Sequence, residues 1–156
     1  MILFFLRHAD AEPDASDDAS RKLTEKGIEQ AQRVAKFCVR SEVLPDLILT
    51  SPVVRARQTA EVVARRLGIG RIESAGWLAC GLAPETCFEK LAGLEGEGVV
   101  MLVGHEPDFS EVIAAFLGCG DGCALHLRKC SLTCVSASTF ARGGAVLEFL
   151  VPARLM

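Results

Sequence analysis

Hydrophobic positions along the chain form two alternating patterns: short continuous apolar runs and longer segments with helical periodicity. The continuous runs cover residues 2–6, 47–49 and 99–103. Such runs are typical of parallel strands covered on both faces, because neither face then needs polar positions. Residues 131–139 and 145–151 predict two further strands, joined as a hairpin through a Gly-Gly turn.

Helical periodicity fills most of the segments between these runs. It predicts helices over residues 25–41, 53–67, 84–94 and 107–117. Thr24 is a suitable N-cap for the first helix. Ser51-Pro52 predicts the start of the second helix, since serine caps well and proline fits a first helical turn. The acidic residues 10–20 are expected to form a loop, and the signals between residues 70 and 98 are weak.

Strands that alternate with helices predict an α/β fold, a three-layer sandwich with a mostly parallel central sheet flanked by helices. The C-terminal strands predict an antiparallel edge. The chain has 156 residues, of which 50% are hydrophobic. This length is enough for one core and too short for two domains of ordinary size, so we expect residues 1–156 to form a single domain.

The charge balance narrows the range of partners. A formal net charge of −3 argues against a protein held on nucleic acid or on anionic lipid by bulk charge. No charged segment followed by a long apolar run opens the chain, and no apolar run approaches the roughly 20 residues of a membrane helix. The sequence therefore predicts a soluble, cytoplasmic protein that binds neither nucleic acid nor membrane.

The chain carries seven cysteines, an odd number in a chain long enough to fold without disulfides. They are predicted to be reduced and to serve mostly as small apolar core residues. Cys119 and Cys123 bracket Gly-Asp-Gly, which resembles half of a metal site, but no second pair follows at zinc-like spacing. We therefore predict neither a metal nor another cofactor.

Polar side chains follow three of the predicted parallel strands. Arg7 and His8 end the first, Ser51 and Arg55 follow the second, and His105 follows the third. Because ligands of such sheets bind beyond the carboxyl ends of the strands, these groups are expected to converge. The third histidine of the chain, His126, lies in a different context and is predicted to be structural.

Two arginines and two histidines at one sheet edge favour a phosphate site. Guanidinium forks bind tetrahedral oxyanions, and the start of a helix adds free N–H groups. A neutral imidazole there can attack phosphorus and form a covalent phosphohistidine. The chain has no G-x-x-x-x-G-K-[ST] loop and no Cys-x5-Arg cradle, so His8 is the candidate nucleophile.

The same residues resemble the signature motifs of the histidine phosphatase superfamily. The matching stretches are Leu6-Arg7-His8-Ala9, residues 49–60 and Val103-Gly104-His105. The small size, Arg-His-Ala in place of Arg-His-Gly, Arg-x-Leu-Thr at 21–24 and Gly-His-Glu-Pro at 104–107 are most similar to the SixA-like branch of phosphohistidine phosphatases. The resemblance extends from residue 1 to about residue 117 and implies a phosphoglycerate mutase-like fold.

The resemblance implies that His8 is the nucleophile and that Arg7, Arg55 and His105 surround the phosphoryl group. Arg21 is a further candidate phosphate contact, with a solvated loop position as the alternative. Arg57 is two residues from Arg55, about 200° around a helix, and is predicted to be a surface charge.

Larger relatives carry an acidic residue that protonates the leaving oxygen, between the second helix and the third motif. Here the first candidate for this general acid is Glu85, with Glu89 one turn further on. Both residues are also suited to capping or surface positions of a short helix. A phosphohistidine substrate lowers the need for an acid, because its leaving group, the histidine ring, departs as neutral imidazole.

The sequence predicts a metal-independent phosphatase that removes the phosphoryl group from phosphohistidine in a partner protein, such as a histidine phosphotransfer domain of a signalling relay. One alternative is a small-molecule phosphomonoesterase of the same superfamily. Another is a phosphate-binding module without catalysis, although such a module has no need of a nucleophile. The short middle segment leaves little material for a cap over the substrate, which argues against mutase chemistry.

Overall fold

A six-stranded sheet forms the middle layer of the protein, in a computed structural model that describes residues 1–13, 17–94, 96–120 and 124–156. The strands are β1 (Ile2–Arg7), β2 (Leu47–Thr50), β3 (Ile72–Ser74), β4 (Val99–Gly104), β5 (Leu132–Ala137) and β6 (Ala145–Val151). Their order in the sheet is β3-β2-β4-β1-β5-β6. The first four are parallel neighbours, whereas β5 pairs antiparallel with both β1 and β6. The mostly parallel sheet with an antiparallel edge is therefore confirmed.

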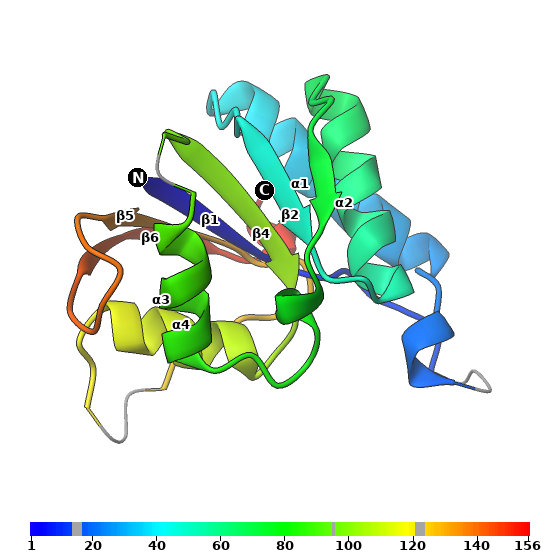
Figure 1. Cartoon of the computed structure of the whole chain (residues 1–156). Coiled ribbons are helices and arrows are strands. Elements are labelled where there is room, and N and C mark those ends of the chain that lie inside the picture. The colour runs from blue at the N-terminus through cyan, green and yellow to red at the C-terminus, as the bar shows by residue number, and fades with distance from the viewer. Residues whose placement is uncertain (14–16, 95, 121–123) are drawn as a thin grey trace.

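Helices cover both faces of this sheet, as Figure 1 shows, with α1 and α2 on one side and α3 and α4 on the other. The α-helices are α1 (Glu25–Arg40), α2 (Val54–Leu67), α3 (Pro84–Ala92) and α4 (Asp108–Phe116). Short 3-10 turns lie at η1 (Asp18–Ser20), η2 (Gly76–Leu78) and η3 (Ala153–Leu155). The three-layer arrangement is confirmed, and within the described ranges no helix is long and apolar enough to cross a membrane.

The side chains of β1 show why its sequence is apolar from Ile2 to Leu6. Leu3 and Phe5 pack into the core layer that contains α4, and Phe4 and Leu6 pack into the layer that contains α1 and α2. Successive residues of a strand point to opposite faces, so a strand covered on both sides needs an apolar residue at every position. All four side chains are buried accordingly.

The starts of α1 and α2 differ in how well the sequence predicted them. Thr24 caps α1 as predicted, with its hydroxyl accepting a hydrogen bond from the Gly27 N–H at 3.0 Å. The predicted cap of α2 was wrong, since the N-cap is Val53 and the helix begins two residues after Pro52. The Ser51 hydroxyl instead accepts from the Val53 N–H at 3.3 Å, before the first helical turn, and lies 2.8 Å from a ring nitrogen of His105.

The register of the parallel strands brings the candidate site residues to one edge. Arg7 of β1 is paired with Gly104 of β4, so His8 and His105 both occupy the first position beyond their strands. Backbone hydrogen bonds continue this alignment, with the His8 N–H donating to the Gly104 carbonyl at 2.9 Å and the Ser51 N–H donating to the Val103 carbonyl at 2.9 Å.

Gly104, at the end of β4, is required by close packing. A Cβ at this position would lie 2.7 Å from the ring of Phe109, which is on α4 and fully buried. Such a contact is closer than non-bonded carbon atoms tolerate, so any larger residue would displace either the ring or the strand end. The glycine thereby lets α4 pack directly beneath the residue that precedes His105.

Candidate active site

A backbone contact of His8 determines which of its two ring nitrogens carries the proton. Its Nδ1 lies 2.8 Å from the carbonyl oxygen of Ala9, which only accepts hydrogen bonds. Nδ1 must therefore carry the proton, and Nε2 carries the lone pair. The ring is buried at the end of β1.

Arg55 lies against the lone pair of His8. Its Nε donates to His8 Nε2 at 3.3 Å, and the side chain is buried although it is charged. Arg55 is the second residue of α2, so the first turn of this helix carries it to the edge where β1 and β2 end. The sequence-predicted pair of histidine and arginine is thus in direct contact.

Thr59 fixes the position of α2 relative to His8. Its hydroxyl donates to the Arg55 carbonyl at 2.7 Å and accepts from the Ala9 N–H at 3.1 Å. One fully buried side chain therefore links the helix that carries Arg55 to the backbone that orients the His8 ring. This link joins two parts of the site that are far apart in sequence, since Arg55 and His8 are separated by 47 residues.

His105 lies on the other side of His8. The two ring centroids are 5.3 Å apart, and His105 Nε2 is 2.8 Å from the Ser51 hydroxyl. His105 Nδ1 is buried and has no hydrogen-bond partner among the residues that the structure describes. A buried polar atom of this kind is rare and marks a position where a ligand would complete the hydrogen bonding.

Arg7 is anchored at one end of its guanidinium. Its Nη1 donates to the Leu127 carbonyl at 2.7 Å, and its Nε is buried without a partner in the described part of the chain. Partial burial lowers the pKa of Arg7, and the nearby Glu106 carboxylate opposes this effect.

Burial and positive neighbours keep both histidines neutral. Burial lowers the pKa of His8 to about 3, assisted by His105, Arg55 and Arg7 and opposed by the Ala9 carbonyl. Burial also lowers the pKa of His105 to about 4, with Arg55 adding to the effect and Asp108 opposing it. At neutral pH His8 Nε2 is therefore unprotonated, as a nucleophilic nitrogen must be.

Asp18 is a site residue that the sequence analysis missed. Its carboxylate lies 3.1 Å from Arg55 Nη2 and 2.8 Å from Arg21 Nη1, and its carbonyl accepts from Arg55 Nη1 at 2.8 Å. Arg21 is thus held by Asp18, and by the Glu12 carbonyl, on the loop outside the histidine pair. The acidic stretch of residues 10–20 was a signal for this contact, but nothing in it distinguished Asp18 from its neighbours.

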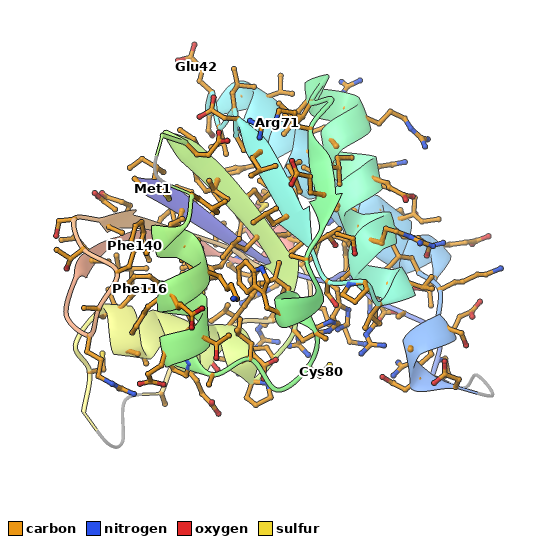
Figure 2. All side chains as sticks on the ribbon, viewed as in Figure 1. Met1, Glu42, Arg71, Cys80, Phe116 and Phe140 are labelled. Carbon is orange, nitrogen blue, oxygen red and sulfur yellow. The ribbon has the colours of Figure 1, made fainter. Side chains whose placement is uncertain are left out.

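Cys80 and Asp108 face the same region. Figure 2 labels Cys80 on the loop that follows η2, close to the edge where β2 and β4 end. Asp108 is buried in the first turn of α4 and accepts a hydrogen bond from the Gly81 N–H at 2.9 Å. Burial raises the pKa of the Cys80 thiol, and the nearby Arg55 opposes the shift.

The candidate general acid Glu85 occupies the surface position that was its alternative. Its carboxylate is exposed in the first turn of α3 and lies 2.8 Å from Arg142 in the turn between β5 and β6. Glu89 is also exposed and pairs with Lys90 at 3.1 Å. Another carboxyl, Glu106, is half-buried, and burial raises its pKa, with Arg7 opposing the shift.

The remaining candidates are Arg57, which lies away from the histidine pair, and the cysteines 119 and 123, of which Cys123 is not among the described residues. Arg57 is exposed and pairs with Glu61 at 3.7 Å, which confirms it as a surface charge. In the described ranges no three His, Cys, Asp or Glu side chains are grouped so as to hold a metal. Cys123 lies outside the described residues, so the prediction about the pair with Cys119 stays a prediction.

The comparisons with known proteins agree with this site. Residues 3–78 match the model of the histidine phosphatase superfamily (branch 1). A protein of Haemophilus influenzae named as a SixA phosphohistidine phosphatase homolog is 31% identical over 132 residues, covering 76% of this chain and 78% of the relative. The chain belongs to the histidine phosphatase superfamily.

Two further proteins match most of the chain. An uncharacterized Picosynechococcus protein is 34% identical over 140 residues, covering 85% of this chain and 82% of the relative. The structure of the histidine phosphatase SixA in complex with tungstate has a TM-score of 0.90 at 24% identity and covers 99% of both chains. The resemblance to the SixA-like branch and the fold it implied are therefore confirmed.

Proposed function

We propose that the protein is a phosphohistidine phosphatase in which His8 Nε2 is the nucleophile. The observation that carries this proposal is the hydrogen bond between His8 Nδ1 and the Ala9 carbonyl. It directs the lone pair of the ring to Nε2, which faces Arg55, and the lowered pKa keeps that lone pair unprotonated. A non-catalytic phosphate-binding module has no use for such an arrangement.

In the first step, the lone pair of His8 Nε2 attacks the phosphorus of the substrate phosphohistidine. The bond between phosphorus and the substrate nitrogen breaks, and its electron pair stays on the departing ring. That ring keeps the proton on its other nitrogen and leaves as neutral imidazole. The His8 ring becomes positively charged, and the Ala9 carbonyl stabilises the Nδ1–H that shares this charge.

In the second step, water attacks the phosphorus on His8. The bond to Nε2 breaks, the electron pair returns to that nitrogen, and the proton lost by water passes to the phosphate product or to solvent. His8 is restored with its proton on Nδ1. Neither step needs a metal ion, because Arg7 and Arg55 supply fixed positive charge beside the phosphoryl oxygens.

His105 assists binding of the phosphoryl group, whereas Asp18 competes with it. The unpaired Nδ1 of His105 is a candidate donor to a phosphoryl oxygen once a bound dianion raises the pKa of the ring. The Asp18 carboxylate must give way at Arg55 when the dianion binds, since two anions cannot share one guanidinium edge without repulsion. Arg21 then becomes available as a further contact.

A phosphohistidine in a partner protein is the proposed substrate. This choice is supported by the Haemophilus influenzae relative, whose name gives it that activity, and by the surface position of Glu85. An imidazole leaving group needs little protonation, whereas an alkoxide needs an acid. A histidine phosphotransfer domain, and with it a cytoplasmic role in signal transduction, remains a prediction.

A small phosphate ester is the second candidate substrate, and one observation favours it. Glu106 is a half-buried carboxyl beside His105 in sequence, and burial raises its pKa towards the range in which an acid donates protons near neutral pH. One of its oxygens accepts from the Ser110 N–H at 3.1 Å. Glu106 is therefore the carboxyl that the ester reaction would use in place of Glu85.

A side-by-side assay distinguishes the two substrates. We would measure kcat/KM for a phosphohistidine peptide and for p-nitrophenyl phosphate with the wild type and Glu106→Gln. The proposal predicts a wild-type preference for phosphohistidine and a change of only a few-fold in the variant. A preference for the ester, with a loss of about 10²-fold or more in Glu106→Gln, would reassign the protein to the phosphomonoesterases.

A further inference from the structure

A cavity of about 450 Å³ next to Arg7 is lined mainly by cationic side chains, and the proposed reaction uses only one of them. Four segments form it: the C-terminal end of β1, the start of α1, the loop of residues 126–129 and the C-terminal residues 152–154. Five of its ten lining residues are arginine or lysine: Arg7, Lys26, Arg128, Lys129 and Arg154. We name this site the basic cavity.

The basic cavity concentrates positive charge on a protein whose formal net charge is −3. Among the described residues its only acidic lining residue is Asp10, so five cations against one carboxylate give a formal charge of +4, with histidine not counted. Asp10 is already paired with Lys129 at 2.6 Å and accepts from the Thr24 hydroxyl at 2.8 Å. Most of the positive charge is therefore not compensated from within the cavity.

Arg128 and Arg154 are the cations best placed to meet a partner. Both side chains are exposed, and neither forms an ion pair with any residue in the described part of the chain. His126 is exposed on the same loop. Two unpaired guanidiniums at the rim of a cavity are suited to bidentate contact with carboxylates.

The basic cavity is tied to the nucleophile through the backbone. The His8 carbonyl accepts from the Cys130 N–H at 3.2 Å, and Arg7 Nη1 donates to the Leu127 carbonyl at 2.7 Å. These bonds hold the loop that carries Arg128 against the end of β1. The basic cavity therefore adjoins the strand end that carries His8, and Arg7 belongs both to this cavity and to the proposed phosphoryl site.

We propose that the basic cavity binds acidic side chains that flank the phosphohistidine of the substrate protein. This inference rests on the proposed function. The cations come from four separate segments of the chain, so a single small anion would contact few of them, whereas several carboxylates on a protein surface would contact all. Charge complementarity therefore favours an acidic protein surface as the occupant.

The expected effect is on substrate capture and not on the chemical step. Exposed charge pairs each contribute a few-fold to affinity, and salt screens them. Acidic flanks should therefore lower KM and leave kcat unchanged. The effect should weaken in concentrated salt, where the Debye length falls to about 3 Å at 1 M.

The test compares two phosphohistidine peptides of equal length, one with glutamate and one with glutamine on both sides of the phosphohistidine. The wild type should prefer the glutamate peptide by about 10-fold in kcat/KM, as expected for two or three exposed charge pairs. The double variant Arg128→Ala/Arg154→Ala should reduce this preference to less than about 2-fold. The control Arg33→Ala/Arg66→Ala removes the same charge from exposed positions elsewhere and should retain it.

The outcomes separate this inference from the proposed function. Turnover of both peptides without a preference, or a preference that survives in Arg128→Ala/Arg154→Ala, overturns the role of the basic cavity alone. Turnover of neither peptide overturns the proposed function. In that case fluorescence anisotropy with the unphosphorylated peptides decides: tighter wild-type binding of the glutamate peptide, lost in the double variant, supports the basic cavity, and equal binding overturns it.

Discussion

The two arginines beside His8 meet very different surroundings. Arg55 is buried, and a carboxylate of the same chain, Asp18, already lies 3.1 Å from its guanidinium. Arg7 is partly exposed, and the cavity that it lines holds four further cations and one carboxylate that is already paired. Positive charge on the Arg55 side is thus paired with an internal anion, whereas most of the positive charge in the cavity on the Arg7 side is unpaired in the described part of the chain.

This difference indicates two roles for positive charge in one site. On the Arg55 side a phosphoryl group has to compete with Asp18, which favours a dianion over a singly charged group. On the Arg7 side Arg128 and Arg154 have no ion-pair partner among the described residues, so weaker anions such as carboxylates are able to bind. The following predictions test this division, beginning with the largest expected effect.

Replacing Arg55 should remove the stronger of the two interactions. We expect Arg55→Ala to lower kcat/KM for a phosphohistidine peptide by about 10²-fold or more, as the loss of a preorganised charge contact does. Arg57→Ala is the matched control, since it removes an exposed guanidinium one half-turn away. Steady-state kinetics check this prediction, and equal losses in the two variants would contradict it.

The histidine pair between the two sides should make stability depend on pH. The folded pKa values of His8 and His105 lie below the ordinary value, so between pH 7 and pH 5 the unfolded chain binds more protons and stability falls. Each histidine accounts for up to about 2 kcal/mol over this interval.

Urea unfolding at pH 7 and pH 5 measures this effect. The drop in the free energy of unfolding should shrink by about half in His105→Asn, because one of two buried neutral histidines is gone. His126→Asn, which removes an exposed histidine, should leave the drop unchanged. A drop that is the same in all three proteins would show that the pair is not held neutral.

Removing the internal anion should strengthen phosphate binding on the Arg55 side. We expect Asp18→Asn to lower the inhibition constant of inorganic phosphate by about 2- to 5-fold, the range of an exposed ion pair. Glu29→Gln is the control, because it removes one exposed negative charge without a site contact. An inhibition constant that rises in Asp18→Asn would mean that Asp18 supports Arg55 and does not compete for it.

The smallest effect is expected at Glu85, which lies on neither side. Its carboxylate is exposed and paired with Arg142, so Glu85→Gln and Arg142→Ala should each change kcat/KM by less than about 3-fold. The same assay with a phosphate ester extends the test. A loss of about 10²-fold with Glu85→Gln alone would restore Glu85 as the general acid.

The sequence predicted those parts of the fold and site that depend on local patterns. The apolar runs of β1 and β4 are continuous because both faces of these strands are covered. Polar residues directly after such a run are easy to recognise in the sequence. This is why His8 and His105 were found. β3 was not predicted, because it has three residues and two of them are exposed.

Contacts between distant segments were beyond local patterns. The contact of Asp18 with Arg55 joins residues 37 apart, and the basic cavity is assembled from four segments, so neither leaves a sequence motif. The start of α2 was placed too early for a related reason. Ser51 is a good cap in isolation, but its hydroxyl also interacts with His105 in the folded protein.

The covalent intermediate on His8 is the central claim, and the ring nitrogen that carries it is the sharpest detail. We would mix enzyme with a phosphohistidine peptide, quench within the first turnover in alkali, and locate the phosphoryl group by ³¹P NMR and peptide mapping. The account predicts an acid-labile adduct on His8 with phosphorus bonded to Nε2, because Nδ1 donates to the Ala9 carbonyl. An adduct on Nδ1, on His105 or on any other side chain would contradict it.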